Sequence, residues 1–384
     1  MKIWFDVLTP KQLLFFEPII QRLKKNHTVL CTSRKYNQVT DLAKIRKQKL
    51  VIIGKYGGVK KHDKLDASLS RSKLLVRKIS KFLPDITLSS CSPEAARVSY
   101  GLGIPPVCFS DSPHATAVMK LSLPYANKLL IPWIIPKSDF ENMGIEPKNI
   151  IQYKTIDAAQ ITKQKVFFGC GTGINSRKWK TILIRTPEDE AAYSSKQSDV
   201  VDIIKKIEKD FLGCHITVLT RYKKQAESLK KKFSKSVQNK SIPCSDYDKS
   251  NPQEMKERGI PEHIRSKFQI VSKVVDGEKM LLDSDVFVGS GGTMTAESAL
   301  LGVPTISYNA IPNRIDDYLV NKKIITRCMT PNKVSERITH IFQLTSYRGG
   351  GSEHTRRLEL QKFVNSLEDP YPILLKTIKS ILKH

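Results

Sequence analysis

The chain has 384 residues, of which 40% are hydrophobic, and at about 150 residues per domain this is enough apolar material for two cores. The composition excludes a largely disordered chain, and no stretch reaches the roughly 18 uncharged apolar residues of a membrane-spanning helix. The net charge is +27, and the seven cysteines lack CxxC spacing, which is typical of reduced thiols rather than of a disulfide framework.

Short apolar, β-branched runs alternate along the chain with longer amphipathic runs, the pattern of a parallel sheet covered by helices. In the first half, strands are predicted at 2–7, 28–32, 50–53, 86–89, 107–110, 128–131 and 150–153. In the second half, they are predicted at 181–185, 216–220, 269–271, 286–288, 305–307 and 324–325. Two similar halves predict an α/β protein of two doubly wound parallel-sheet domains.

The composition between these halves suggests the domain boundaries. Residues 1–153 form the predicted N-terminal domain, and 154–180 form an interdomain linker rich in Gly, Lys and small polar residues, including GCGTG at 169–173. Residues 181–355 form the predicted C-terminal domain, with an irregular insertion at 235–261. Residues 356–384 are a helical tail, whose amphipathic end could pack back on the N-terminal domain.

The positive charge is concentrated in the first 100 residues, which hold 21 Lys and Arg against 7 Asp and Glu. Its main segments are 21–25, 44–49 and 55–81. Three interpretations of this charge are open. The lysines could simply keep the helix surfaces soluble, or they could attract the anionic headgroups of a membrane surface, or they could bind nucleic acid. No nucleic-acid motif is present, so we do not expect a nucleic-acid partner.

Candidate catalytic residues of the first half follow its predicted strands, because ligands bind outside the carboxyl ends of strands in doubly wound sheets. Asp6 follows the first strand, Glu94 stands at a helix start after the fourth, and Asp111 and His114 follow the fifth. A carboxylate beside an imidazole can orient a general base near neutral pH. The alternatives are a turn aspartate and a surface histidine.

The segment 286–308, VFVGSGGTMTAESALLGVPTISY, predicts a strand, a Gly-rich turn, a helix and a second strand. Ser290, Gly291 and Gly292 allow close approach of a ligand, and the helix that begins at Thr293 would present free N–H groups to a phosphate. Glu297, one turn further, could accept hydrogen bonds from ribose or sugar hydroxyls. The alternative is a tight turn without a ligand, in which glycine is needed only because a larger residue would not fit.

Two arginines end strands of the second half. Arg185 ends TILIR and Arg221 ends ITVLTR. Guanidinium groups can bind a diphosphate with two hydrogen bonds each. The alternative is surface pairing with the acidic residues 188–190.

Several segments carry a family resemblance. They are MKIWFDVLTPKQLLFFEPII, SPEAARVSYGLGIP, SDSPHA, ILIRTPEDEAAY and GSGGTMTAESALLGVPTISY. Over most of residues 1–345 the chain resembles the domain of unknown function 354 family. It is more distantly similar to the GT-B superfamily, which includes UDP-N-acetylglucosamine 2-epimerases and nucleotide-sugar glycosyltransferases. The resemblance implies two Rossmann-like domains facing a cleft. By the same resemblance, Ser290, Gly291, Gly292 and Thr293 would meet the diphosphate, Glu297 the ribose, and Arg185 a phosphate.

The chain departs from this pattern in two places. Pro10-Lys11-Gln12 stands where the family commonly has a proline and a histidine, which leaves His114 as the candidate base. The chain also lacks the histidine–arginine pair typical of the epimerases, which disfavours epimerase chemistry.

We therefore expect a glycosyltransferase-like enzyme that moves a sugar from a nucleotide diphosphate, UDP first among them, to an unknown acceptor. That acceptor could be anionic or membrane-associated. His114 with Asp111 would be the base, with Asp6 and Glu94 as substitutes, and no metal or cofactor is expected. A nucleotide-sugar 2-epimerase or hydrolase and a non-catalytic nucleotide-binding protein are the alternatives. With no signal peptide, the expected location is the cytoplasm, or the inner face of the membrane as a peripheral protein.

Overall fold

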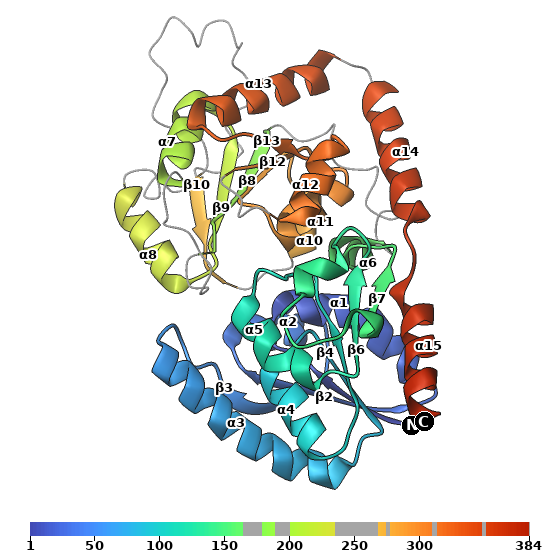
Figure 1. The fold of residues 1–384 in the computed structure, drawn as a ribbon. Coiled ribbons are helices and arrows are strands. Elements are labelled where there is room, and N and C mark those ends of the chain that lie inside the picture. The colour runs from blue at the N-terminus through green and yellow to red at the C-terminus, as the bar shows by residue number, and fades with distance from the viewer. Residues whose placement is uncertain are drawn as a thin grey trace, which may run out of the picture.

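The computed structural model describes residues 1–163, 179–188, 200–234, 268–273, 277–308, 313–347 and 351–383. Two α/β domains, each with its own parallel sheet, follow each other along the chain, and Figure 1 shows the N-terminal domain below the C-terminal one. The predicted fold class is confirmed.

The N-terminal sheet has seven parallel strands in the order β3-β2-β1-β4-β5-β6-β7. Its strands are β1 (Lys2–Asp6), β2 (Thr28–Lys35), β3 (Val51–Lys55), β4 (Ile86–Ser89), β5 (Pro106–Phe109), β6 (Lys128–Pro132) and β7 (Ile150–Tyr153). Its helices are α1 (Pro10–Leu23), α2 (Asn37–Ile45), α3 (Lys61–Phe82), α4 (Pro93–Gly101), α5 (Thr116–Ser122) and α6 (Asp157–Thr162). The order reverses between β1 and β4, the point where a doubly wound sheet binds its ligand.

The C-terminal sheet has six parallel strands in the order β10-β9-β8-β11-β12-β13. Its strands are β8 (Thr181–Arg185), β9 (His215–Leu219), β10 (Phe268–Val271), β11 (Val286–Gly289), β12 (Thr305–Ser307) and β13 (Thr326–Arg327). Its helices are α7 (Val200–Asp210), α8 (Lys223–Lys232), α10 (Gly277–Leu282), α11 (Thr293–Leu300), α12 (Arg314–Asn321) and α13 (Pro331–Tyr347). Here the order reverses between β8 and β11.

One predicted strand was wrong by two residues. The apolar pair 324–325 was expected to form the last strand, but β13 begins at Thr326. Ile325 is buried in a core cluster with residues of α11 and α12, and the amides of Ile324 and Ile325 bond to the carbonyl of Leu319. The isoleucines therefore close α12 and fill the core before the strand starts.

The expected linker begins with helix α6, which packs between the domains. Ile156, Ala158 and Ala159 share a buried cluster with Ala296 and Ala299 of α11. Small side chains on both helices allow close approach, so this segment joins the domains through a core of its own. The GCGTG sequence at 169–173 and the predicted insertion at 235–261 lie outside the described residues.

Two C-terminal helices return along one side of the molecule to the N-terminal domain. They are α14 (Gly351–Ser366) and α15 (Pro370–Leu382), drawn in red in Figure 1. Leu374 and Ile378 of α15 are buried in the N-terminal core, and the Arg22 guanidinium lies 3.7 Å from the centre of the Tyr371 ring. The amphipathic face of α15 therefore completes the first domain.

None of the helices in the described ranges combines the length and the hydropathy that crossing a bilayer requires.

Candidate functional site

A cavity of about 390 Å³ lies between the two domains. Its N-terminal wall comes from the loop after β1 and from α1, α2 and α6, and its C-terminal wall from the carboxyl ends of β8, β9 and β10 and the start of α11. The charged residues on its described lining are Lys11, Arg46, Arg185, Arg221 and Lys273 against Glu188, Glu278 and Glu297. Lys11 and Arg46 pair with Asp111, Asp157 and Glu17 outside this lining, so attraction of an anionic ligand would come from individual cations of the C-terminal wall rather than from the net charge of the cavity.

Arg185 is the most unusual of these side chains. Its Nη1 donates to the carbonyl of Thr220 at 3.0 Å, but its buried Nε has no hydrogen-bond partner among the described residues. Burial lowers the pKa of Arg185 to about 9, and the nearby Arg221 adds to this effect. A buried guanidinium whose charge is disfavoured is a group that an anion would stabilise.

Arg221 is held more firmly than Arg185. Its Nε donates to the carbonyl of Thr186 at 3.3 Å, and its Nη1 lies 3.7 Å from Glu188 Oε2. The Tyr222 hydroxyl also donates to Glu188. Arg221 therefore pairs with an acidic residue, as the alternative interpretation of the sequence had it. It also lies on the cavity wall, as Arg185 does.

The turn from β11 to α11 has the geometry that the glycines suggested. Gly291 and Gly292 have φ of 80° and 79°, values that favour glycine, and Thr295 Oγ1 donates to the carbonyl of Gly291 at 3.0 Å. No described side chain caps α11. The first N–H groups of this helix, those of Thr293 and Met294, therefore lie at an uncapped N-terminus.

The cavity meets only part of the predicted loop. Thr293 and Glu297 line it, whereas Ser290, Gly291 and Gly292 lie outside its lining. The Gly292 N–H is directed at the buried carboxylate of Asp316, at the start of α12, and partly offsets the rise that burial causes in the pKa of that group. The structure thus places the available amides at the helix start rather than in the glycines.

On the N-terminal wall, Lys11 bridges two carboxylates that come from distant segments. Its Nζ pairs with Asp111 and lies 2.8 Å from Asp157 Oδ2, and the Tyr153 hydroxyl donates to Asp157 Oδ1 at 3.2 Å. Burial raises the pKa of Asp157 to about 6, and the Asp111 carboxylate adds to the rise. The cluster therefore holds a carboxyl group that changes its protonation close to neutral pH.

Asp111 and His114 lie near each other, but the ion pair and hydrogen bond of the Asp111 carboxylate are with other residues. Besides Lys11, it accepts a hydrogen bond from Ser112 Oγ at 2.8 Å. Burial opposes the charge of Asp111, but Lys11 outweighs it and keeps the pKa of this carboxyl below its usual value. His114 is exposed, and partial desolvation lowers the pKa of its ring although Asp111 acts in the opposite direction.

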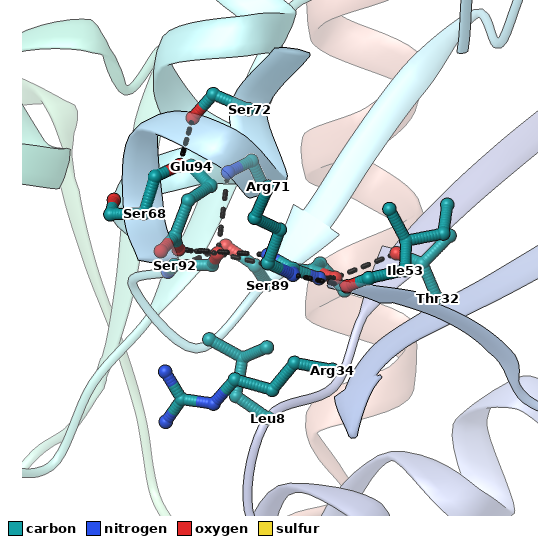
Figure 2. Close-up of polar contacts among 12 residues, drawn as sticks. Leu8, Thr32, Arg34, Ile53, Ser68, Arg71, Ser72, Ser89, Ser92 and Glu94 are labelled. Atoms are coloured by element: carbon teal, nitrogen blue, oxygen red, sulfur yellow. Dashed lines mark hydrogen bonds and ion pairs between the residues drawn. The ribbon is translucent and has the colours of Figure 1, made fainter. Parts of the chain in front are cut away.

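Asp6 and Glu94 lie in a buried polar network (Figure 2). Arg71 donates to both carboxylate oxygens of Asp6, from Nη1 at 3.0 Å and from Nη2 at 2.6 Å. Ser92 Oγ and Thr32 Oγ1 each donate to Asp6 at 2.6 Å. Glu94 Oε2 lies 3.6 Å from Arg71 Nη1.

This network leaves Asp6 poorly placed as a general base. Burial opposes the charge of Asp6, but Arg71 outweighs it and holds the pKa of the carboxyl below its usual value. The side chain is fully buried, and neither Asp6 nor Glu94 lines the cavity. Asp111, His114 and Asp157 do not line the cavity either; Lys11 does, and its Nζ pairs with Asp111 and Asp157.

The described residues contain no group of three or more His, Cys, Asp or Glu side chains arranged to hold a metal ion.

A family profile described as "Protein of unknown function (DUF354)" matches residues 1–247 and 252–383. The chain belongs to the DUF354 family. The DUF354 protein is 26% identical to an uncharacterised protein of Methanocaldococcus jannaschii over 393 positions, which cover 100% of this chain and 99% of that relative.

Solved structures share the fold of the DUF354 protein at low sequence identity. The UDP-GlcNAc 2-epimerase from Neisseria meningitidis, bound to UDP-GlcNAc, superposes with a TM-score of 0.66 and 12% identity, covering 99% of this chain and 100% of that one. A glycosyltransferase from Rickettsia africae superposes with a TM-score of 0.57 and 12% identity, covering 100% and 99%. These similarities establish the GT-B fold.

Sequence reasoning missed two residues of the DUF354 site. Lys11 follows the first predicted strand and departs from the family pattern, but it was not chosen as a site residue, and Asp157 was assigned to the linker. Both follow strands of the N-terminal sheet, Lys11 after β1 and Asp157 after β7. The rule that selected Asp111 could therefore have selected Asp157, had the seventh strand been read in the same way.

Proposed function

We propose that this protein is a glycosyltransferase-like enzyme that binds a nucleotide-diphosphate sugar on its C-terminal domain and an acceptor against its N-terminal domain. The observation that carries the proposal is Arg185, a half-buried cation on the wall of an interdomain cavity, whose buried Nε has no hydrogen-bond partner within the described ranges. The GT-B fold and structural neighbours solved with UDP-GlcNAc or UDP support a nucleotide-sugar ligand.

The donor would bind with its diphosphate between Arg185 and the start of α11. Transfer breaks the bond between the anomeric carbon and the β-phosphate oxygen, so negative charge develops on the leaving diphosphate. Arg185 and the N–H groups of Thr293 and Met294 can stabilise that charge, and Arg221 stands next to them. Glu297, one turn into α11, would accept hydrogen bonds from the ribose hydroxyls. In this proposal the protein's own groups stabilise the charge on the leaving diphosphate.

The acceptor would lose its hydroxyl proton on the N-terminal side of the cavity. In this proposal the carboxylates are Asp111 and Asp157, which pair with the Nζ of Lys11 on the cavity lining, and His114 stands beside Asp111 with a lowered pKa that favours its neutral ring. A neutral imidazole or an ionised carboxylate can accept the proton. Asp157 joins Asp111 and His114 as a candidate because its pKa lies near 6.

A nucleotide screen tests the donor half of the proposal. We expect one of UDP, GDP, dTDP, CDP and ADP, with UDP first, to raise the melting temperature by several degrees, because a ligand at 100 times its Kd stabilises the fold by about 2.7 kcal/mol. The matching nucleoside without phosphates is the control and should give little shift. A screen in which no diphosphate stabilises the protein would contradict the proposal.

The pH dependence of turnover tests the base. If ionised Asp157 takes the proton, kcat/KM should fall as the pH decreases through about 6, and Asp157→Asn should remove this ionisation together with most of the activity. His114→Gln is the matched variant. If the decrease of kcat/KM at low pH persists in Asp157→Asn and disappears in His114→Gln, the base is His114 instead.

One observation favours a nucleotide-sugar 2-epimerase or hydrolase as the second candidate. Proton abstraction and return on the sugar itself need carboxyl groups that titrate near neutral pH, and Asp157 is one. Incubation of the purified protein with nucleotide sugars and no acceptor separates the two reactions. Epimerised or hydrolysed sugar at enzymatic rates would support the second candidate. Nucleotide binding without turnover, and with indifference to Asp111→Ala and His114→Ala, would point to a non-catalytic binding protein.

A further inference from the structure

Helix α3 carries a row of exposed apolar side chains on the outside of the N-terminal domain. Leu65 is 60% exposed, Leu69 61% and Val76 40%. At 3.6 residues per turn these positions fall within roughly 40° of one another around the helix, so they form a stripe along one face, with Ser72 between Leu69 and Val76. Figure 1 shows α3 along the outer edge of the N-terminal domain.

The buried face of α3, centred about 120° around the helix from the stripe, fixes this orientation. Ala67, Arg71, Leu75 and Ile79 are its buried residues. Leu75 and Ile79 pack in a core cluster with Trp4 and residues of α4, and Arg71 holds Asp6. Rotation of the helix to hide the stripe would therefore expose a core face and break a buried ion pair, so the stripe faces solvent in the folded protein.

Basic side chains surround the stripe. Lys73 and Arg77 follow it on one side of the helix, where the exposed Asp66 also lies, and Lys61 lies on the other side; the three cations are exposed. Residues 60–83 hold eight Lys and Arg against two Asp, and only Arg71 among these cations is fully buried. An apolar ridge with a basic border is the surface that lies in the headgroup region of an anionic bilayer.

We propose that α3 docks this protein on an anionic lipid bilayer, with Leu65, Leu69 and Val76 entering the interface and the flanking lysines and arginine contacting headgroups. A second copy of the chain fits this face less well, because a two-fold contact through it would set like charges against each other. Nucleic acid would use the cations but not the aliphatic ridge.

The docking surface is independent of the interdomain cavity. No α3 residue lines the cavity, and the inference holds whatever reaction takes place there. If the proposed glycosyl transfer is also correct, docking would bring the N-terminal domain to an acceptor carried in the lipid. Failure of lipid binding leaves the nucleotide screen untouched, and failure of the screen leaves lipid binding untouched.

Co-sedimentation with vesicles tests the inference. We expect the wild-type chain to pellet with vesicles of phosphatidylglycerol and phosphatidylcholine at least about tenfold more strongly than with phosphatidylcholine alone, since several basic residues meet the surface. The variant L65S/L69S/V76S should lose most of this binding at unchanged net charge. Lys73→Glu with Arg77→Glu should also lose it.

Matched variants elsewhere on the surface are the controls. L121S/L212S removes two equally exposed leucines, and Lys230→Glu with Lys231→Glu makes the same charge change on α8. Both should bind vesicles like the wild type, and all variants should melt like it, because the changed side chains are exposed. Equal binding by wild type and L65S/L69S/V76S would overturn the inference. So would a wild-type dimer that the triple variant converts to a monomer, because the stripe would then be a contact between copies.

Discussion

Arg185→Ala should raise the Kd of the best nucleoside diphosphate at least about 30-fold, since removing one partner of a buried charge pair costs 2 kcal/mol or more. The guanidinium offers an unpaired Nε inside the cavity, and no described carboxylate forms an ion pair with it. Calorimetric titration of the wild type and the variant measures the difference. Arg221→Ala should have a smaller effect, because Glu188 already pairs with Arg221.

The control for this prediction is an arginine of the same domain that lies outside the cavity. Arg327 pairs with Asp317 at 2.8 Å and does not line the cavity, so Arg327→Ala should leave the Kd unchanged. Without ligand, Arg185→Ala should melt within about 4 °C of the wild type, because the lost hydrogen bond to Thr220 is offset by relief of a buried charge. If Arg185→Ala binds the nucleotide with the Kd of the wild type, the diphosphate does not bind at Arg185 and the proposed donor site is wrong.

Asp6→Asn should destabilise the folded protein by about 3 kcal/mol, because the substitution leaves the buried Arg71 with only the more distant Glu94 as a counter-charge. Denaturant unfolding followed by circular dichroism measures the loss. The pKa of Asp6 is lowered in the folded state, so the wild-type pair stabilises the fold above the unfolded value of 3.8 and this contribution disappears as the pH falls through the folded pKa. The difference between variant and wild type should therefore shrink in strong acid.

Two further variants separate the ion pair from general damage. Arg71→Met in the Asp6→Asn background should recover part of the stability, since an apolar side chain replaces an unpaired charge. Arg22→Ala breaks the partly exposed pair with Asp369 and should cost less than about 1 kcal/mol. If Asp6→Asn unfolds at the wild-type midpoint yet abolishes turnover, Asp6 has a catalytic role after all.

The sequence predicts the architecture well because the signals for strands and turns are local. Arg185 could be placed at the cavity because it is the last residue of a short apolar strand, and parallel strands end at one edge of the sheet. The strand, the two left-handed glycines and the helix after Val286 follow from adjacent residues in the same way. Local sequence patterns are therefore enough to predict which residues form the C-terminal wall of the cavity.

The sequence could not reveal pairings between distant segments. Asp6 was correctly placed at a strand end, but Arg71 reaches it from 65 positions away, on the buried face of α3. Lys11, Asp111 and Asp157 come from three segments that only the folded sheet brings together. The Gly292 amide is similarly directed at Asp316, which belongs to a later helix. These contacts add a lysine-bridged pair of carboxylates, Asp111 and Asp157, to His114 as candidates for the base.

A crystal structure with the most stabilising nucleoside diphosphate would test the central claim most directly. We predict that a phosphate oxygen lies within hydrogen-bond distance of the Arg185 guanidinium and of the N–H of Thr293 or Met294, with the ribose at Glu297. A diphosphate bound elsewhere, with Arg185 turned to a carboxylate of its own chain, would contradict the account.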